Sequence, residues 1–94
     1  MPFDHFRPTM EPARSIYDAL IAEAEHRPGR VCEEWINAER AAVWKVARRM
    51  AELRGLRIPT LEEIERAERT AIGHVDYAAK VAYAVSDTMM KGGE

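Results

Sequence analysis

The sequence predicts an all-α fold, a three-helix antiparallel bundle with helices at about 10–27, 30–54 and 60–90. Long stretches between prolines and glycines carry apolar residues at helical spacing, and none alternates with the period of two that a strand requires. The connections between these stretches are short. Sequential helices are therefore expected to lie side by side and antiparallel.

Helix-end signals support these boundaries. Pro28 stops the first helix, and Gly55 occupies the position just after the second. Thr60 and Glu63 have the spacing of a capping box at the start of the third helix, which ends before the glycines at 92–93. We expect residues 10–94 to form one helical domain.

Residues 1–9 form an N-terminal arm outside this plan, and Phe3 and Phe6 in it are the only phenylalanines of the chain. A frayed end is one interpretation of the arm. The other is an aromatic arm that docks on a neighbouring subunit.

Composition excludes several classes of protein. A formal net charge of −2 is incompatible with an extended nucleic-acid surface, and no apolar run approaches the ~20 residues of a membrane span. The first ten residues lack the apolar core of a secretory signal. Cys32 is the single cysteine, so neither an internal disulfide nor a multi-cysteine zinc site is expected. These features predict a cytoplasmic protein.

Two apolar stripes each contain one carboxylate, Glu39 in the second helix and Glu68 in the third. The stripe of the second helix comprises Cys32, Trp35, Ile36, Val43, Val46, Ala47, Met50 and Leu53. The stripe of the third comprises Leu61, Ile64, Ala71, Ile72, Val75, Ala79, Ala82, Tyr83, Met89 and Met90. An antiparallel hairpin turning near Arg57 would separate the two carboxylates by roughly 12 Å. We therefore expect separate pairing, with Arg14, Arg66, His74 or a tyrosine, rather than a shared catalytic or metal site.

No complete catalytic set is found. Helical nucleotide pyrophosphohydrolases hold Mg²⁺ with an E-x-x-E helix and an E-x-x-D helix. Glu62 and Glu65 supply the first half, but Ala84 stands where the second half needs a glutamate before Asp87. We expect no enzyme activity, no metal and no cofactor.

The best candidate for binding is a strip on the second helix formed by Arg40, Trp44 and Arg48, which are spaced four residues apart. Such a strip can stack on a base or grip an acidic partner. The alternative is that Trp44 packs between neighbouring helices while the arginine stems lie along the surface. A second candidate group interrupts an apolar surface on the third helix; it consists of His74, Asp76, Tyr77 and Lys80.

Self-association is expected through the last half of the third helix. Its residues from Val75 to Val85 are apolar nearly all round, and an outer helix of a three-helix domain cannot bury every side within its own chain. The residues placed outside the core stripe are Tyr77, Ala78, Val81, Ala84 and Val85. A second copy would cover them; the alternative is an alanine-rich helix with ordinary exposed apolar residues.

Three segments carry a resemblance to a group of known proteins. They are Gly73, His74, Val75, Asp76, Tyr77 and Lys80; Met10, Glu11, Pro12, Ala13 and Arg14; and Glu34, Trp35, Ile36, Ala38, Glu39 and Arg40. Together they resemble small uncharacterised accessory proteins of tailed bacteriophages and prophages. The resemblance implies a bacterial host cytoplasm and an accessory factor that binds and blocks a host or defence protein, and it transfers no catalytic residue.

These observations predict a non-enzymatic, homo-oligomeric interaction protein that binds and modulates a host or defence macromolecule. The first alternative is an oligomeric protein that holds a nucleotide in an Arg–Trp pocket. The second alternative is a helical nucleotide hydrolase.

Overall fold

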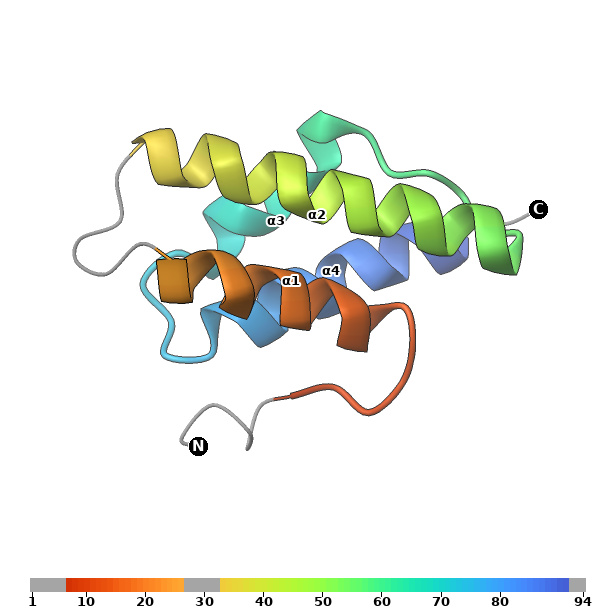
Figure 1. Cartoon of the computed structure of the whole chain (residues 1–94), viewed down its shortest axis with the longest axis horizontal. Helices are drawn as coiled ribbons and strands as arrows, with labels where there is room; N and C mark the ends of the chain where they lie inside the picture. Colours follow the sequence, from red (N-terminus) through yellow and green to blue (C-terminus); the bar gives the residue numbers. More distant parts are fainter. Residues whose placement is uncertain (1–6, 27–32, 92–94) are drawn as a thin grey trace.

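The structure, a computed structural model, describes residues 7–26 and 33–91. Within those residues it is all-helical, without a β-strand. The helices are α1 (Ala13–His26), α2 (Glu33–Arg54), α3 (Leu61–Ala71) and α4 (Tyr77–Lys91). The all-α class is confirmed, whereas the number of helices differs from the prediction, and the first two begin about three residues later than expected (Figure 1).

The prediction of one helix over 60–90 is wrong, because the chain breaks at Gly73. After α3 the backbone of Ile72 is extended, with ψ 134°, and Gly73 adopts a φ of 87°. That left-handed conformation is open to glycine without the steric penalty that a Cβ carries. The amide of His74 then donates to the carbonyl of Ala71 (3.1 Å), which closes the turn before Tyr77 starts α4.

The four helices form two layers. α1 and α2 lie side by side and run in opposite directions, while α3 and α4, drawn fainter, lie behind them (Figure 1). α1 packs against both α2 and α4, and α3 packs mainly against α4 and less extensively against α2. α4 is therefore enclosed on two sides by helices of its own chain.

This enclosure changes which residues of the last helix form the core. Val81 and Val85, predicted to lie outside the core stripe, are completely or almost completely buried. Several residues assigned to the predicted stripes are instead largely exposed: Leu53, Leu61, Ile72, Val75, Tyr83 and Met90. The break at Gly73 is the physical reason for the errors at Val75, Tyr83 and Met90, since it changes the orientation of the chain after Gly73 relative to the continuous helix from which the stripe was drawn. Leu61 and Ile72 precede the break and lie at the two ends of α3. Cys32, Trp35 and Ile36 lie outside the side chains that the structure describes.

The expectation that a second copy must cover Val81 and Val85 is thereby corrected. Both side chains are already buried within the chain, where α4 packs against α1 and α3. Self-association through α4 has to use the residues of that helix that remain exposed.

The predicted capping box at the start of α3 is confirmed. Thr60 Oγ1 accepts from the amide of Glu63 at 3.1 Å, and the Glu63 carboxylate accepts from the amide of Thr60 at 2.9 Å. Glu63 also pairs with Arg57, and the amide of Arg57 donates to the carbonyl of Met89 (3.2 Å). The loop between α2 and α3 is thus fixed to the end of α4.

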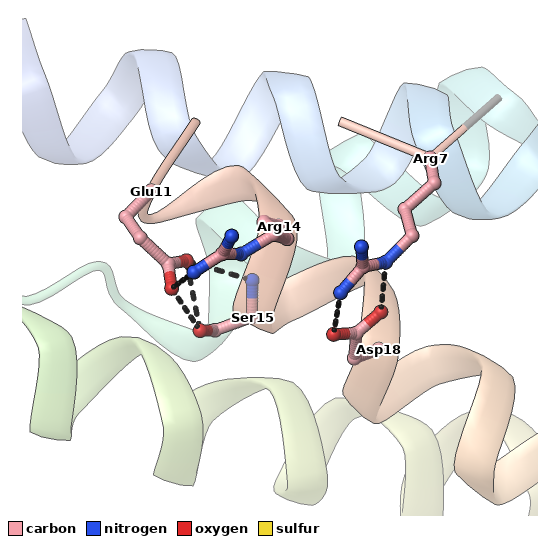
Figure 2. A network of polar contacts seen from close by, with 5 residues as sticks. All are labelled: Arg7, Glu11, Arg14, Ser15 and Asp18. Carbon is pink, nitrogen blue, oxygen red and sulfur yellow. Dashed lines mark hydrogen bonds and ion pairs between the residues drawn. The ribbon is translucent and has the colours of Figure 1, made fainter. Parts of the chain in front are cut away.

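Polar contacts also fix the N-terminal segment onto α1 (Figure 2). Arg7 donates twice to the Asp18 carboxylate, at 2.9 and 2.8 Å, and Pro8 beside it is fully buried. The Glu11 carboxylate accepts from the amide and hydroxyl of Ser15 and thereby caps the first turn. The end of the predicted arm therefore belongs to the folded domain, while Phe3 and Phe6 lie outside the described residues.

Candidate functional site

An open hollow lies over the outer face of α2, with α1 and α3 at its edges. Its volume is about 560 Å³, and most of its lining is apolar. The lining residues are Glu23 of α1, Ala38, Ala41, Ala42, Trp44 and Lys45 of α2, and Leu61 of α3. Trp44 is half-buried with one side packed on the core, and Leu61 is 53% exposed. We call this site the Trp44 hollow.

The predicted strip of Arg40, Trp44 and Arg48 is divided by the structure. The guanidinium carbon of Arg48 lies 5.3 Å from the centre of the Trp44 ring, a distance suited to a cation–π contact. Arg40 instead turns toward α3, where its Nε donates to Glu68 Oε1 at 2.9 Å and its Nη1 lies 3.5 Å from Glu65 Oε2. Only Trp44 and Arg48 remain together at the surface.

This division counts against a nucleotide site at the strip. A phosphate-binding arginine needs free donors aimed at the ligand, whereas the cation of Arg40 is engaged by two carboxylates. Arg48 already lies over the Trp44 ring. Among the residues lining the Trp44 hollow, Lys45 alone is basic.

Arg40 belongs to a polar cluster in the interior, formed with Glu39, Glu68 and Tyr77. The hydroxyl of Tyr77 donates to Glu39 Oε1 at 3.0 Å, and Arg40 donates to Glu68 Oε1. Glu39 and Glu68 are both buried, at 7% and 1% exposure. The other oxygen of Glu68, Oε2, is buried without a hydrogen-bond partner among the described residues.

The electrostatics of this polar cluster follow from burial. Burial is the main factor raising the pKa of the Glu68 carboxyl, while the bond from Arg40 opposes that shift. Burial, reinforced by the charges of Glu39 and Glu68, also raises the pKa of Tyr77, so its hydroxyl remains a donor. Glu39 and Glu68 are paired separately, as expected: Glu39 accepts from a tyrosine, Tyr77, whereas Glu68 accepts from Arg40, which was not among the expected partners. The turn at Gly73 returns the start of α4 toward α2, where Tyr77 reaches Glu39.

Burial also decides what the polar cluster can do. A side chain that is 1% exposed offers no route to a substrate from solvent. Two buried polar pairs, Arg40 with Glu68 and Tyr77 with Glu39, are typical of internal contacts that fix the relative positions of helices. The cluster therefore connects α2, α3 and α4, and we assign it a structural role.

The second predicted group, around the start of α4, is also separated. Tyr77 points into the polar cluster, whereas His74 is exposed in the preceding turn. Asp76 and Lys80 line a groove of about 580 Å³ between α3 and α4. The groove is lined by Ala67, Thr70, Ala71, Asp76, Ala79, Lys80, Tyr83, Ala84 and Asp87. We call it the α3–α4 groove.

The described residues contain no cluster of three or more histidine, cysteine or acidic side chains suited to a metal ion. Glu65, one half of the E-x-x-E pair, is engaged by Arg40 and Arg69. Glu62 lies on the same helix but faces the arginines Arg66 and Arg69 around a smaller hollow. In the same part of the chain, no helix has the length and apolar character to span a membrane.

Sequence reasoning identified Trp44 but missed the rest of the Trp44 hollow. Ala38, Ala41, Ala42 and Lys45 follow one another at the three- and four-residue spacing of a single helical face, opposite the buried stripe. That spacing was a usable signal. The contribution of Leu61 was not, because only the packing of α3 beside α2 brings it to Trp44.

Comparisons with known proteins find no matching family, no matching curated protein and no matching solved structure.

Proposed function

We propose that this chain is a non-enzymatic interaction protein that acts by occupying a protein partner through the Trp44 hollow. The observation that carries the proposal is the pairing of a half-buried Trp44 with a largely exposed Leu61 over a floor of alanines. Tryptophans in partly enclosed apolar sites are enriched among residues that dominate binding energy. Exposed apolar surface with a charged rim is typical of protein–protein contact sites.

The form of the hollow favours a protein over a small molecule. Small-ligand sites enclose most of the ligand and converge several polar groups on it. Here the hollow is open, and its polar side chains, Glu23 and Lys45, lie at the edge of an apolar floor. An apolar anchor of a partner helix fits such a floor, because the short side chains of Ala38, Ala41 and Ala42 allow close approach.

The charge of the rim indicates the chemistry of the partner. Lys45, Arg48 and Arg49 are exposed on α2 around the hollow or one turn beyond it, against the carboxylates of Glu23 and of Glu62, which follows Leu61. We propose a partner segment that combines one large apolar side chain with flanking acidic residues. In the setting implied by the phage resemblance, this partner is a bacterial host or defence protein.

The proposal is tested by capture of partners from bacterial lysate, with bound proteins and nucleotides both identified. Leu61→Asp places a charge in the hollow yet suits the first turn of α3, where an acidic residue complements the helix dipole. Ala41→Arg fills the floor from an exposed position with a good helix former. Both variants are expected to lose at least about 90% of a captured protein, the effect of removing a binding hot spot.

Matched controls make the same chemical changes elsewhere. Val75→Asp replaces a side chain that is 86% exposed, and Leu53→Arg replaces one that is 68% exposed on α2. Both controls should capture the partner as the wild type does, and circular dichroism should show equal helix content in all five proteins. Equal capture by Leu61→Asp and the wild type would refute the proposal. Enrichment of a nucleotide without any protein would favour the ligand-binding alternative.

A further inference from the structure

The outer face of α4 carries charges, exposed at Lys80, Asp87 and Lys91 and partly buried at Asp76, that have no partner in the described part of the chain. Asp76, Lys80, Asp87 and Lys91 form no ion pair or side-chain hydrogen bond there, although the members of each successive acid–base pair are four residues apart, a spacing that would permit pairing along the helix. Asp76 precedes α4, but its carbonyl accepts from the amide of Lys80 at 2.9 Å, so it continues the same helical path.

These four charges share one face with Tyr83 and Ala84. At 100° per residue all six positions fall within an arc of about 100°, and they extend over about 22 Å of the helix axis. Tyr83 is 54% exposed, and Ala84 beside it is exposed too. This α4 face forms one wall of the α3–α4 groove, whose other wall on α3 is uncharged and consists of Ala67, Thr70 and Ala71.

The order of the charges makes the face complementary to itself. In an antiparallel pair of identical helices, residues face each other when their numbers add to a constant. With the two-fold axis between Tyr83 and Ala84, Asp76 faces Lys91 of the second copy and Lys80 faces Asp87 of the second copy. Each contact occurs twice by symmetry, so every charge on the face meets its opposite.

We propose that a second copy of this chain docks on the α4 face, with the two α4 helices antiparallel about a two-fold axis between Tyr83 and Ala84. The ring of Tyr83 then lies against Ala84 of the second copy. Because the alanines of the groove have small side chains, the two α4 helices can pack closely. The paired charges fix the relative direction and the register of the two helices. A parallel arrangement would place like charges opposite one another, so the pattern specifies the antiparallel one.

This proposal uses a surface different from the Trp44 hollow and does not depend on it. It also replaces the earlier expectation of self-association through Val81 and Val85, which are buried. The pairing resembles other isologous contacts, in which the same patch is used by both subunits. Its charged rim is typical of an association weakened by salt.

Charge reversal tests the register directly. Lys80→Glu puts two like-charged contacts at the interface, and Asp87→Lys does the same with the opposite sign. Each variant alone should dimerise at least about tenfold more weakly than the wild type, as expected when exposed ion pairs become repulsive. An equimolar mixture should recover the wild-type affinity, because the introduced glutamate of one chain then faces the introduced lysine of the other. The second contact in that mixed dimer is the wild-type pair of Lys80 and Asp87.

Both variants should keep their fold. Lys80→Glu adds an acid near the start of α4 and Asp87→Lys adds a base near its end, which are the favourable ends for those charges. Arg54→Glu and Glu52→Lys make the same two charge changes at exposed positions of α2 and serve as matched controls. Both controls should associate as the wild type does.

Sedimentation equilibrium measures the association from about 10 µM to about 1 mM at low and at high salt, a range suited to a weak association. The expected mass of the wild type rises at low salt toward twice 10.7 kDa. A mass of 10.7 kDa over the whole range would overturn the proposal. Dimerisation that the single reversals leave unchanged, or that their mixture fails to recover, would overturn it as well.

Discussion

Replacing Arg40 removes the cation that pairs with the buried Glu68. We choose Arg40→Met because it keeps the apolar stem and deletes only the charged end. The wild-type pair joins Arg40 Nε to Glu68 Oε1 at 2.9 Å, with 19% and 2% of the two side chains exposed. The variant leaves a carboxylate whose second oxygen already lacks a partner among the described residues.

The expected loss of stability is large for a single substitution. Removing one partner of a buried ion pair typically costs about 3–5 kcal/mol. The cost should be smaller here, about 2–3 kcal/mol at neutral pH, since Glu68 can take up a proton instead of remaining charged. For a domain of this size that corresponds to a fall in melting temperature of roughly 10–20 °C.

The pH dependence separates loss of charge pairing from loss of packing. Burial raises the pKa of Glu68 in the folded protein above 4.5, and Arg40 opposes this shift, so Arg40→Met should raise that pKa further. An acid whose folded pKa is raised contributes stability that is complete below its unfolded pKa and is lost as pH rises through the folded value. The cost of Arg40→Met should therefore be smallest below pH 4.5 and increase as the pH rises above it.

The assay is urea denaturation of the wild type, Arg40→Met, Glu68→Gln and the double variant at about pH 3.5 and about pH 7.5, below and above the carboxyl titration. Glu68→Gln alone should change stability by less than about 1 kcal/mol, because it keeps an acceptor for Arg40 and removes a desolvated charge. The double variant should recover most of the loss at the higher pH. An equal cost of Arg40→Met at both pH values would refute this reasoning and assign the role of Arg40 to packing.

Three further variants test other parts of the structure. Thr60→Ala should lower the free energy of unfolding by about 1 kcal/mol through loss of the α3 cap, while Thr70→Ala, an exposed control in the last turn of α3, should change it by less than about 0.5 kcal/mol; equal urea midpoints for the two would contradict the capping role. Tyr77→Phe should cost about 1–3 kcal/mol in the same assay, because Glu39 loses a buried donor, and an unchanged midpoint would show that the bond adds nothing. Gly73→Ala should cost about 1 kcal/mol from its φ of 87° alone, since a Cβ there meets no neighbour; a stabilised variant would contradict that conformation.

The polar cluster shows which features of the protein interior could be predicted from the sequence. A carboxylate in an apolar stripe is a visible anomaly, and both Glu39 and Glu68 are indeed buried. Of their partners, a tyrosine was expected and Glu39 has one in Tyr77, but Arg40 was not expected as the partner of Glu68. Periodicity places residues on a face of one helix, but the offset between neighbouring helices depends on the length of the loop and on packing, which sets Arg40 beside Glu68.

For the candidate binding surfaces too, the sequence predicted what lies within one helix and not what a neighbouring helix contributes. Trp44 and Arg48 were identified from their spacing along α2, and the structure keeps them together. Leu61 completes the Trp44 hollow from another helix, so no pattern within α2 could indicate it. The self-complementary face of α4 became recognisable only when the structure showed which of its residues remain exposed.

The sequence by itself determined the all-α class, the C-terminal end of α2 before Gly55, and the capping box at Thr60, because each depends on residues within one turn of each other. The tertiary structure alone decided whether the chain would continue as a helix through Gly73. A glycine within a helix costs only about 1 kcal/mol, so local propensity leaves both outcomes open. The break returns α4 alongside α1 and α3, buries Val81 and Val85, and brings Tyr77 to Glu39, and those long-range contacts decide between the two.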